Sequence, residues 1–231
     1  DITVFEKNEA IGGLMTLGIP DFKLEKYIIE RRVKLLEEEG IKFKVNSHVG
    51  KKPTVKKLLK DFDYICLAGG SEKPRDLPIP GRELDGVHFA LDFLFQQNRR
   101  NAERKIKGDE ITAKDKHVVV IGGGDTGSDC VGTSIRQGAK SVTQIEILPA
   151  PPRRRREDNP WPQWPNVMRT SSSQEEGCKR DFAVLSDKFI GLKKVKAIKC
   201  ARVEWSKPDK DGRREMKKIP KSQFELKADL V

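Results

Sequence analysis

A glycine-rich run directly after an apolar strand constrains the fold of this chain more than any other feature. Residues 117–121 read as a strand, glycines in the pattern G-x-G-x-x-G follow, and a helical stretch then runs to Gln137. The first glycine permits a sharp turn, the second lets a pyrophosphate approach bare backbone, and the third lets helix and strand pack closely. The free N–H groups and positive dipole at a helix start suit phosphate oxygens. We therefore predict a nucleotide phosphate loop, with a tight turn that binds nothing as the alternative. Its residues are Gly122, Gly123, Gly124, Asp125, Thr126 and Gly127.

Two signals after this loop concern which nucleotide binds. In NAD-binding units an acid that bonds the ribose 2′-OH follows the loop at about the position of Glu146. Glu146 lies either at the tip of a predicted strand over 141–148 or inside that strand. The four arginines at 153–156 have planar, paired donors suited to the 2′-phosphate of NADP, or they form a solvated basic loop. The two signals conflict, so the sequence leaves NADH and NADPH open.

Elements of two kinds alternate along the first part of the chain. Apolar patterns predict strands at 3–5, 41–45 and 64–68, the last of them buried, with helices at 24–39 and 54–60 between them. Gly40 is placed to end the first helix and Thr54 to cap the second. Alternating strands and helices indicate an α/β fold with a parallel sheet.

The rest of the chain combines the same pattern with an antiparallel one. Residues 74–86 are rich in Pro and Gly and read as a linker or crossing, and residues 90–100 read as a helix. Residues 149–173 read as irregular, and Trp161 and Trp164 with their neighbouring prolines indicate either a pinned loop or a partner surface. Extended pieces at 195–205, 213–219 and 224–231, with a turn sequence at 208–212, predict a small antiparallel meander.

The N-terminal segment has the pattern of the second half of another dinucleotide-binding unit. Glu6 ends a strand, as the ribose-binding acid of an FAD site does, and Gly12-Gly13-Leu14 would bring backbone near the nucleotide. We therefore predict two Rossmann-like domains in an α/β chain. They are a partial FAD-binding domain at 1–80 and an NAD(P)H-binding domain with the meander at 81–228, followed by the start of a return strand to the FAD domain at 229–231. Since the chain opens on a strand without Met, we expect a fragment of a longer protein.

Composition excludes several classes of function. No stretch approaches the roughly 20 apolar residues of a membrane helix, and no signal segment opens the chain, so we expect no membrane partner. The net charge of +11 would suit nucleic acid, but the basic residues are spread and no RNA-binding aromatic signature or Cys/His finger occurs, so we expect no nucleic-acid partner. The cysteines form no CxxC pair, which argues against a metal site and a thioredoxin-reductase-like enzyme. We expect structural, reduced thiols and therefore a cytoplasmic protein. The cysteines are Cys66, Cys130, Cys178 and Cys200.

Several segments resemble the flavoprotein part of the glutamate synthase small (β) subunits. They are VFEK at 4–7 with IGGL at 11–14, GIPDFKL at 18–24, PRDLPIPGREL at 74–84, VIGGGDTGSDCVGTS at 120–134 and DNPWPQWP at 158–165. The last two are highly specific to that subunit. The wider group includes the electron-input part of dihydropyrimidine dehydrogenase and resembles adrenodoxin reductase.

The resemblance implies an NAD(P)H-oxidising electron-input module. Hydride would pass from the nicotinamide to FAD, and electrons would leave through iron–sulfur clusters to a large subunit that makes glutamate from glutamine and 2-oxoglutarate. By motif match, the residues that would contact FAD are Glu6, Gly13, Leu14, Lys23 and Val49. Those that would hold the NAD(P)H pyrophosphate are Gly123, Gly124, Asp125 and Thr126, with Arg155 at the adenosine ribose. Direct hydride transfer needs no general acid or base, so we expect no catalytic side chain.

The chain also departs from the family pattern. Residues 67–71 read LAGGS where the family commonly has Ala-Thr-Gly-Ala, and three extra arginines surround Arg155. The cysteine-rich iron–sulfur domain, the first FAD glycine motif and the C-terminal flavin segment fall outside the chain, so we expect the fragment alone to be inactive and not to hold FAD tightly. Two alternatives stay open. One is the electron-input flavoprotein of a dihydropyrimidine dehydrogenase-like or ferredoxin–NADP reductase-like enzyme, and the other is a fragment that only binds NAD(P)H.

Overall fold

The computed structural model describes residues 1–231 except 72, 107 and 208, and it divides into two compact units. Unit 1 comprises Asp1–Arg75 and Leu94–Gly108, and unit 2 comprises Asp76–Phe93 and Asp109–Val231. The break at Arg75 falls inside the segment 74–86 that we read as a linker. The division at residues 80 and 228 into FAD- and NAD(P)H-binding domains stays a prediction. The helix α4 (Ala90–Asn101) contributes residues to both units.

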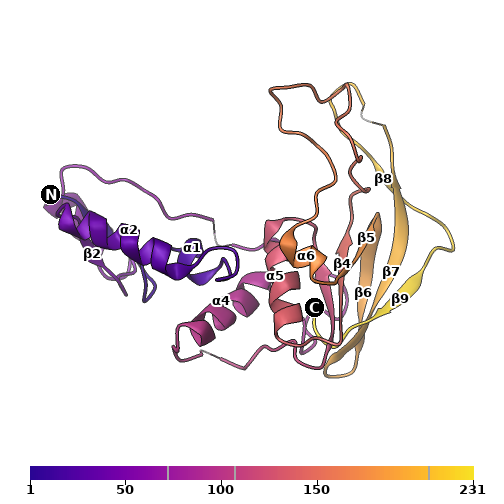
Figure 1. The fold of residues 1–231 in the computed structure, drawn as a ribbon, viewed down its shortest axis with the longest axis horizontal. Coiled ribbons are helices and arrows are strands. Elements are labelled where there is room, and N and C mark those ends of the chain that lie inside the picture. Colours follow the sequence, from indigo (N-terminus) through magenta and orange to yellow (C-terminus); the bar gives the residue numbers. More distant parts are fainter. Residues whose placement is uncertain (72, 107, 208) are drawn as a thin grey trace. The chain divides into compact units, whose positions relative to one another are not determined.

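Unit 1 is built on a pair of parallel strands, drawn in indigo to violet in Figure 1. Its strands are β1 (Thr3–Phe5) and β2 (Lys42–Lys44), and its own helices are α1 (Leu14–Leu17), α2 (Lys26–Glu38) and α3 (Val55–Asp61). The predicted strands at 3–5 and 41–45 and the predicted helices at 24–39 and 54–60 are confirmed, whereas the short helix α1 was not predicted. Gly40 follows α2 with φ +94°, a left-handed conformation that favours glycine, and the Thr54 hydroxyl accepts a 3.3 Å hydrogen bond from Lys57 N–H at the start of α3.

The predicted buried strand at 64–68 is wrong. These residues form no strand, and the side chains of Tyr64 and Leu67 are 93% and 90% exposed. A strand is stabilised by hydrogen bonds to a neighbouring strand, and the sheet of unit 1 contains only β1 and β2 among the described residues. An apolar sequence without a paired neighbour therefore stays extended and unpaired. Cys66 is exposed for the same reason, against the expectation of an apolar environment.

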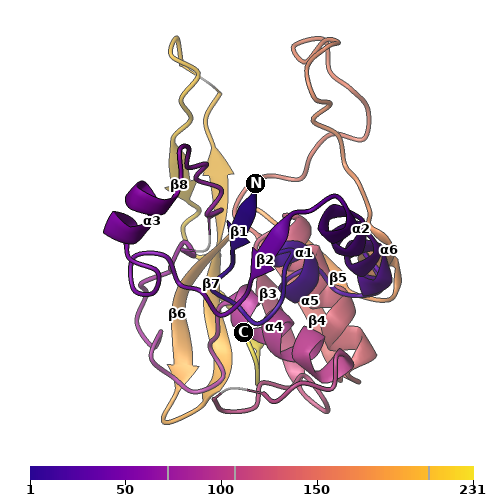
Figure 2. The same cartoon turned by 90° about the vertical axis from the view of Figure 1, so that its left-hand side faces the viewer.

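Unit 2 contains a second parallel sheet, in the order β3-β4-β5. Its strands are β3 (His117–Ile121), β4 (Ser141–Glu146) and β5 (Lys179–Phe182), and its helices are α5 (Asp125–Arg136) and the short α6 (Ser172–Glu175). The helix α5 connects β3 to β4, as a parallel pair requires, and packs against the sheet (Figure 2). The strand β5 was not predicted, because its sequence KRDF carries almost no apolar signal. Near the C-terminus, Leu230 forms a parallel bridge to Val118.

An antiparallel sheet completes unit 2. Its strands are β6 (Val184–Gly191), β7 (Val195–Trp205), β8 (Met216–Lys218) and β9 (Phe224–Lys227), and the other three all pair with β7. The predicted meander is confirmed, with β6 as an additional strand; a register shift between Ser186 and Lys188 interrupts its alternation. In the predicted turn at 208–212, Pro208 lies outside the described residues, and the Asp209 carboxylate accepts hydrogen bonds from the N–H groups of Asp211 and Arg213.

One hydrophobic core joins both sheets of unit 2. Val119 of β3 and Ile145 of β4 are 1% exposed and belong to the same cluster as Phe189, Ile198 and Cys200 of the antiparallel sheet. Apolar side chains of the 74–86 segment also pack against this cluster: Leu77, Ile79 and Leu84. The core anchors β3 and β4 close to their carboxyl ends, where the predicted phosphate loop begins.

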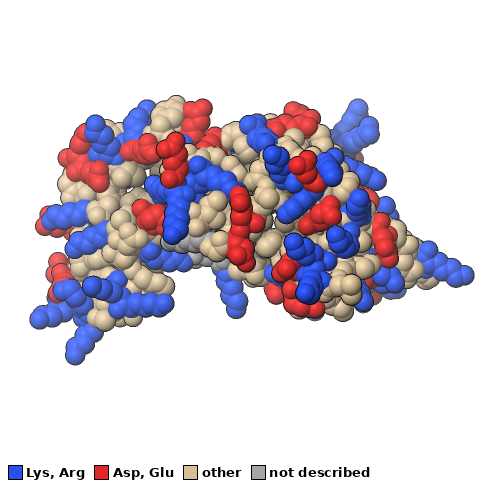
Figure 3. Space-filling model, turned by 90° about the horizontal axis from the view of Figure 1, so that it is seen from below, with Lys and Arg blue, Asp and Glu red and all other residues tan. Residues whose placement is uncertain are grey.

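The surface carries charges of both signs. In Figure 3, Lys and Arg side chains are interspersed with Asp and Glu on the face shown. Within the described residues, no helix has the length and apolar character needed to cross a membrane.

Candidate functional site

The predicted strand–loop–helix arrangement is present at residues 117–136. β3 ends at Ile121, Gly122 turns the chain with φ +118°, and α5 begins at Asp125. The Gly122 N–H still donates to the Ile145 carbonyl at 2.8 Å, so the turn leaves the sheet directly at its carboxyl edge. The left-handed conformation of Gly122 is one that a side chain strongly disfavours.

The other two motif glycines have different surroundings. A Cβ on Gly127 would lie 2.5 Å from the Gly122 carbonyl oxygen and 2.9 Å from Gln144 Nε2, so this position must lack a side chain for helix and strand to pack. A Cβ on Gly124 would meet nothing within 4 Å, so the backbone there is open. The N–H of Ser128 bonds the Gly124 carbonyl at 3.0 Å, and the N–H groups before it in α5 have no acceptor within the helix.

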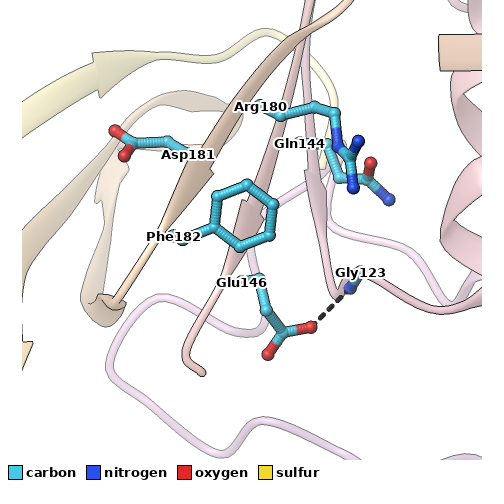
Figure 4. Close-up of a pocket in the computed structure, with 6 residues that line it drawn as sticks. All are labelled: Gly123, Gln144, Glu146, Arg180, Asp181 and Phe182. Atoms are coloured by element: carbon cyan, nitrogen blue, oxygen red, sulfur yellow. Dashed lines mark hydrogen bonds between the residues drawn. The ribbon is translucent and has the colours of Figure 1, made fainter. Parts of the chain in front are cut away.

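Glu146 is the last residue of β4, which answers whether it lies at the strand tip or inside the strand. Its Oε2 accepts a 2.6 Å hydrogen bond from Gly123 N–H (Figure 4). Its Oε1 accepts one of 3.1 Å from Leu148 N–H. The structure thus brings Glu146 and the predicted phosphate loop together. The N–H of Gly123 points at this carboxylate.

A buried pair of glutamines, which was not predicted from the sequence, supports the same loop. Gln144 Nε2 donates to the Gly122 carbonyl at 2.9 Å, and Gln174 Nε2 donates to Gln144 Oε1 at 2.8 Å. The two residues are 3% and 8% exposed. The available signal was a polar residue at a position of β4 whose alternation predicts burial, two residues before Glu146.

A surface pocket lies beside the loop on one face of the sheet. It is lined by Gly123, Gln144, Glu146, Arg180, Asp181 and Phe182 (Figure 4). The register pairs Gln144 with Arg180 and Glu146 with Phe182, and the Arg180 guanidinium lies 5.3 Å from the centre of the Phe182 ring. The carboxylate of Asp181 points away from these four side chains and accepts two hydrogen bonds from Arg202, at 2.6 and 2.9 Å. Arg180 and Phe182 were not predicted because β5 was not predicted.

The arginine run lies in the long segment 149–171, which projects away from the sheet (Figure 1). Arg155 donates to the Gln163 carbonyl at 2.9 Å, so the structure shows it bound to its own loop rather than to the phosphate loop. Asn159 ties the loop together through hydrogen bonds with the Trp164 carbonyl and Asn166 N–H. Trp164 and Trp161 are nevertheless 77% and 83% exposed. The loop is therefore pinned internally while both indole rings face outward.

The residues matched to FAD contacts all lie in unit 1. Glu6 follows β1, and its carboxylate accepts hydrogen bonds from Asn8 N–H and Nδ2 at 2.7 and 2.9 Å. Its carbonyl accepts from Ser47 N–H at 2.8 Å, which places the segment leading to Val49 at the same edge of the sheet. Gly13 caps the start of α1, where Leu14 begins the helix. Lys23 lies in the turn before α2 and does not follow the end of a strand, as Glu6 does.

Two cysteines of unit 2, Cys130 and Cys200, are buried and have raised pKa values. Burial, assisted by the neighbouring Asp129 carboxylate, raises the pKa of Cys130 to about 12. Burial also raises the pKa of Cys200 to about 11. Both thiols are therefore neutral at neutral pH and are poor nucleophiles. Across the part of the chain that the structure describes, His, Cys, Asp and Glu side chains form no group of three suited to a metal ion.

Comparisons with known proteins agree with this geometry. The model of the family "Pyridine nucleotide-disulphide oxidoreductase" matches residues 25–163. The chain is 46% identical over 235 residues to the "Glutamate synthase [NADPH] small chain" of Mycobacterium tuberculosis (strain CDC 1551 / Oshkosh), covering all of this chain and 47% of that protein. It is 44% identical over 241 residues to the "Glutamate synthase [NADH]" of Schizosaccharomyces pombe, covering all of this chain and 11% of that protein.

A solved structure supports the fold. Mycobacterium tuberculosis FprA in complex with NADPH superposes with a TM-score of 0.72 at 21% identity, over 99% of this chain and 62% of that one. The chain spans about half the length of the glutamate synthase small chains that it matches. It is homologous to them over its whole length, and with the family model covering residues 25–163, the chain belongs to the pyridine nucleotide-disulphide oxidoreductase family.

Proposed function

We propose that this chain is part of the NAD(P)H-oxidising electron-input module of a glutamate synthase. The observation that carries the proposal is the turn at 122–127, whose backbone is open at Gly124 and whose Gly123 N–H is bonded to Glu146 at the tip of the next strand. Such a loop, acid and helix start are the parts that bind a dinucleotide in an α/β sheet. The relatives named for NADPH and for NADH support a nicotinamide nucleotide as the ligand.

Each part of the loop has its own task in this proposal. The open backbone at Gly124 and the N–H groups of Asp125 and Thr126 hold the pyrophosphate, because they precede the first bonded N–H of α5. Glu146 receives ribose hydroxyls, since a carboxylate offers about four acceptor positions and the structure assigns two of them to backbone N–H groups. Arg155 is the candidate partner for a 2′-phosphate, through movement of its loop.

FAD is the proposed second cofactor, and the residues matched to it belong to unit 1. The fit rests on two residues. Gly13 has φ +53° and nothing within 4 Å of a Cβ position, and Glu6 lies directly after β1. When bound, FAD accepts the hydride and releases electrons one at a time. The chain's own residues bind and orient the two cofactors: Glu6, Gly13, Leu14, Lys23 and Val49 on the flavin side, and Gly122–Gly127 on the nicotinamide side.

The remaining steps belong to the whole protein. We propose that electrons pass through iron–sulfur clusters outside this chain to a glutamate synthase large subunit, which forms glutamate from glutamine and 2-oxoglutarate, in the cytoplasm. The support is homology to small chains of about twice this length. Electron-input flavoproteins of other NAD(P)H-dependent oxidoreductases share the fold and are the alternative.

The test is a calorimetric titration of the purified chain with NADH and with NADPH at one low salt concentration. We expect saturable binding of at least one nucleotide. A preference for NADPH that disappears in Arg155→Ala would assign the 2′-phosphate to the arginine run. Equal or tighter binding of NADH would assign selectivity to Glu146. If neither nucleotide binds while circular dichroism shows a folded chain, the proposed function is wrong.

A further inference from the structure

A single peptide of the phosphate loop is held on both sides by one strand. The Gly122 carbonyl accepts from Gln144 Nε2 at 2.9 Å, and the Gly123 N–H of the same peptide donates to Glu146 Oε2 at 2.6 Å. In a trans peptide the C=O and N–H point in opposite directions. Gln144 and Glu146 are two residues apart on β4, so their side chains leave the same face of the sheet. Together they fix the plane of the Gly122–Gly123 peptide.

Gln144 is itself held by a chain of buried hydrogen bonds. Gln174 Nε2 donates to Gln144 Oε1 at 2.8 Å, and Ser171 N–H donates to Gln174 Oε1 at 2.9 Å. The Ser171 hydroxyl lies 2.5 Å from the Ser128 hydroxyl of α5. These hydrogen bonds therefore form a continuous series from Ser171, at the C-terminal end of the segment 149–171, to the carbonyl of Gly122.

The two ends of this series of hydrogen bonds fix the orientation of the side-chain amides of Gln144 and Gln174. The Gly122 carbonyl can only accept, and the Ser171 N–H can only donate. Reversing either glutamine amide would bring like groups face to face and break two hydrogen bonds at once. Water does not replace them readily, because Gln144 and Gln174 are almost fully buried. The absent side chain of Gly127 leaves the room that Gln144 Nε2 occupies.

We propose that Gln144 and Gln174 are positioning residues of the nucleotide site. Gln144 holds the Gly122–Gly123 peptide in the plane that turns the following backbone toward the phosphates. Gln174 couples that peptide to Ser171, the N-cap residue of α6, through the buried hydrogen bonds on either side of its amide. This inference rests on the proposed function, and a buried polar pair that serves packing alone is the competing account.

The first test compares Gln144→Glu with Gln223→Glu, the same change at an exposed glutamine outside the site. An introduced carboxylate cannot donate to the Gly122 carbonyl, so we expect the Kd for NADH and NADPH to rise about tenfold or more at about pH 8. At about pH 5.5 the buried carboxyl gains a proton and regains a donor, and the loss should shrink to about threefold. Gln223→Glu should bind like the unchanged chain at both values. A Kd within about twofold of the unchanged chain at both pH values overturns the proposal.

The second test is hydrogen exchange of the Gly123 amide, followed by NMR without nucleotide. Gln144→Met removes the hydrogen bonds at similar volume and without charge, and we expect Gly123 to exchange about tenfold faster or more while the core amides of β3 stay protected. Unchanged exchange at Gly123 overturns the proposal, as does faster exchange without any loss of affinity.

These readouts separate the two proposals. If the unchanged chain binds neither nucleotide, the proposed function fails, and the Gly123 exchange rate still decides whether Gln144 holds the loop. If Gln144→Glu does not fold, Gln174→Met decides instead, because it leaves Gln144 in place and removes only the residue behind it. We then expect faster Gly123 exchange and weaker nucleotide binding; unchanged values would contradict the coupling.

Discussion

The carboxylate of Glu146 accepts a 2.6 Å hydrogen bond from the backbone N–H of Gly123, across the turn between β3 and α5. A negative charge fixed there attracts ribose hydroxyls and repels a 2′-phosphate. Glu146→Gln keeps an acceptor for Gly123 and removes the charge. We expect the ratio of the Kd for NADPH to the Kd for NADH to fall about tenfold, or about 1.4 kcal/mol. Calorimetry of both nucleotides measures it, and an unchanged ratio would mean that Glu146 does not select the nucleotide.

Two motif glycines, Gly124 directly before α5 and Gly127 within it, should respond differently to substitution by alanine. In Gly127→Ala the new Cβ would lie 2.5 Å from the Gly122 carbonyl, so we expect a loss of about 1–3 kcal/mol in the free energy of unfolding, measured in urea. In Gly124→Ala the Cβ meets open space, and we expect a stable chain with weaker nucleotide binding.

Gly69→Ala is the matched control for both, because its Cβ would also meet nothing within 4 Å and the residue lies in unit 1. It should leave stability and binding unchanged. Full binding by Gly124→Ala would show that no phosphate approaches this backbone.

Arg202 of β7 joins the antiparallel sheet to β5 of the parallel sheet. Its guanidinium donates to both carboxylate oxygens of Asp181 and also to the Phe182 carbonyl at 3.2 Å. The hydrogen bonds to the Asp181 carboxylate and its negative charge raise the pKa of Arg202. Because lysine cannot reproduce the paired geometry, and because the Arg202 side chain is 41% exposed, we expect Arg202→Lys to cost about 1 kcal/mol of stability. Arg214→Lys, at an exposed position, should leave the free energy of unfolding unchanged. Equal losses in the two variants would contradict a stabilising role for the Arg202–Asp181 pair.

The cysteines should fall into distinct classes of reactivity. Cys66 is exposed, whereas Cys130 and Cys200 are buried with pKa values raised to about 12 and about 11. We expect iodoacetamide at about pH 8 to modify Cys66 within minutes and to leave the other two intact until urea unfolds the chain. Mass spectrometry of the alkylated peptides distinguishes them. Modification of folded Cys130 as fast as Cys66 would contradict its burial on α5.

The strand, turn and helix at residues 117–136 were predictable from sequence because three local signals agree there. The apolar run 117–121, the glycine spacing and the helix after it all specify one turn, and the structure has β3, Gly122 and α5 at those positions. The tip of β4 was less certain, because Ile147 and Leu148 extend its apolar pattern beyond Glu146. The structure ends the strand at Glu146, whose carboxylate accepts the Leu148 N–H.

Other elements depended on contacts distant in sequence. The apolar residues 64–68 resemble a buried strand, yet no described strand pairs with them, so the local signal misled. β5 has the opposite character: charged residues form a strand because β4 supplies its hydrogen bonds. Gln144 and Gln174 are 30 residues apart, and only the folded chain shows that their amides meet.

We propose above all that a nicotinamide nucleotide binds at the loop of residues 122–127. The most direct measurement is an NMR titration of the isotope-labelled chain with NADH and with NADPH, which follows each backbone amide. The account predicts the largest shifts at Gly124, Asp125 and Thr126, with smaller ones at Glu146 and none in β8. Binding that leaves the amides of 122–127 unmoved, or shifts confined to unit 1, would contradict it.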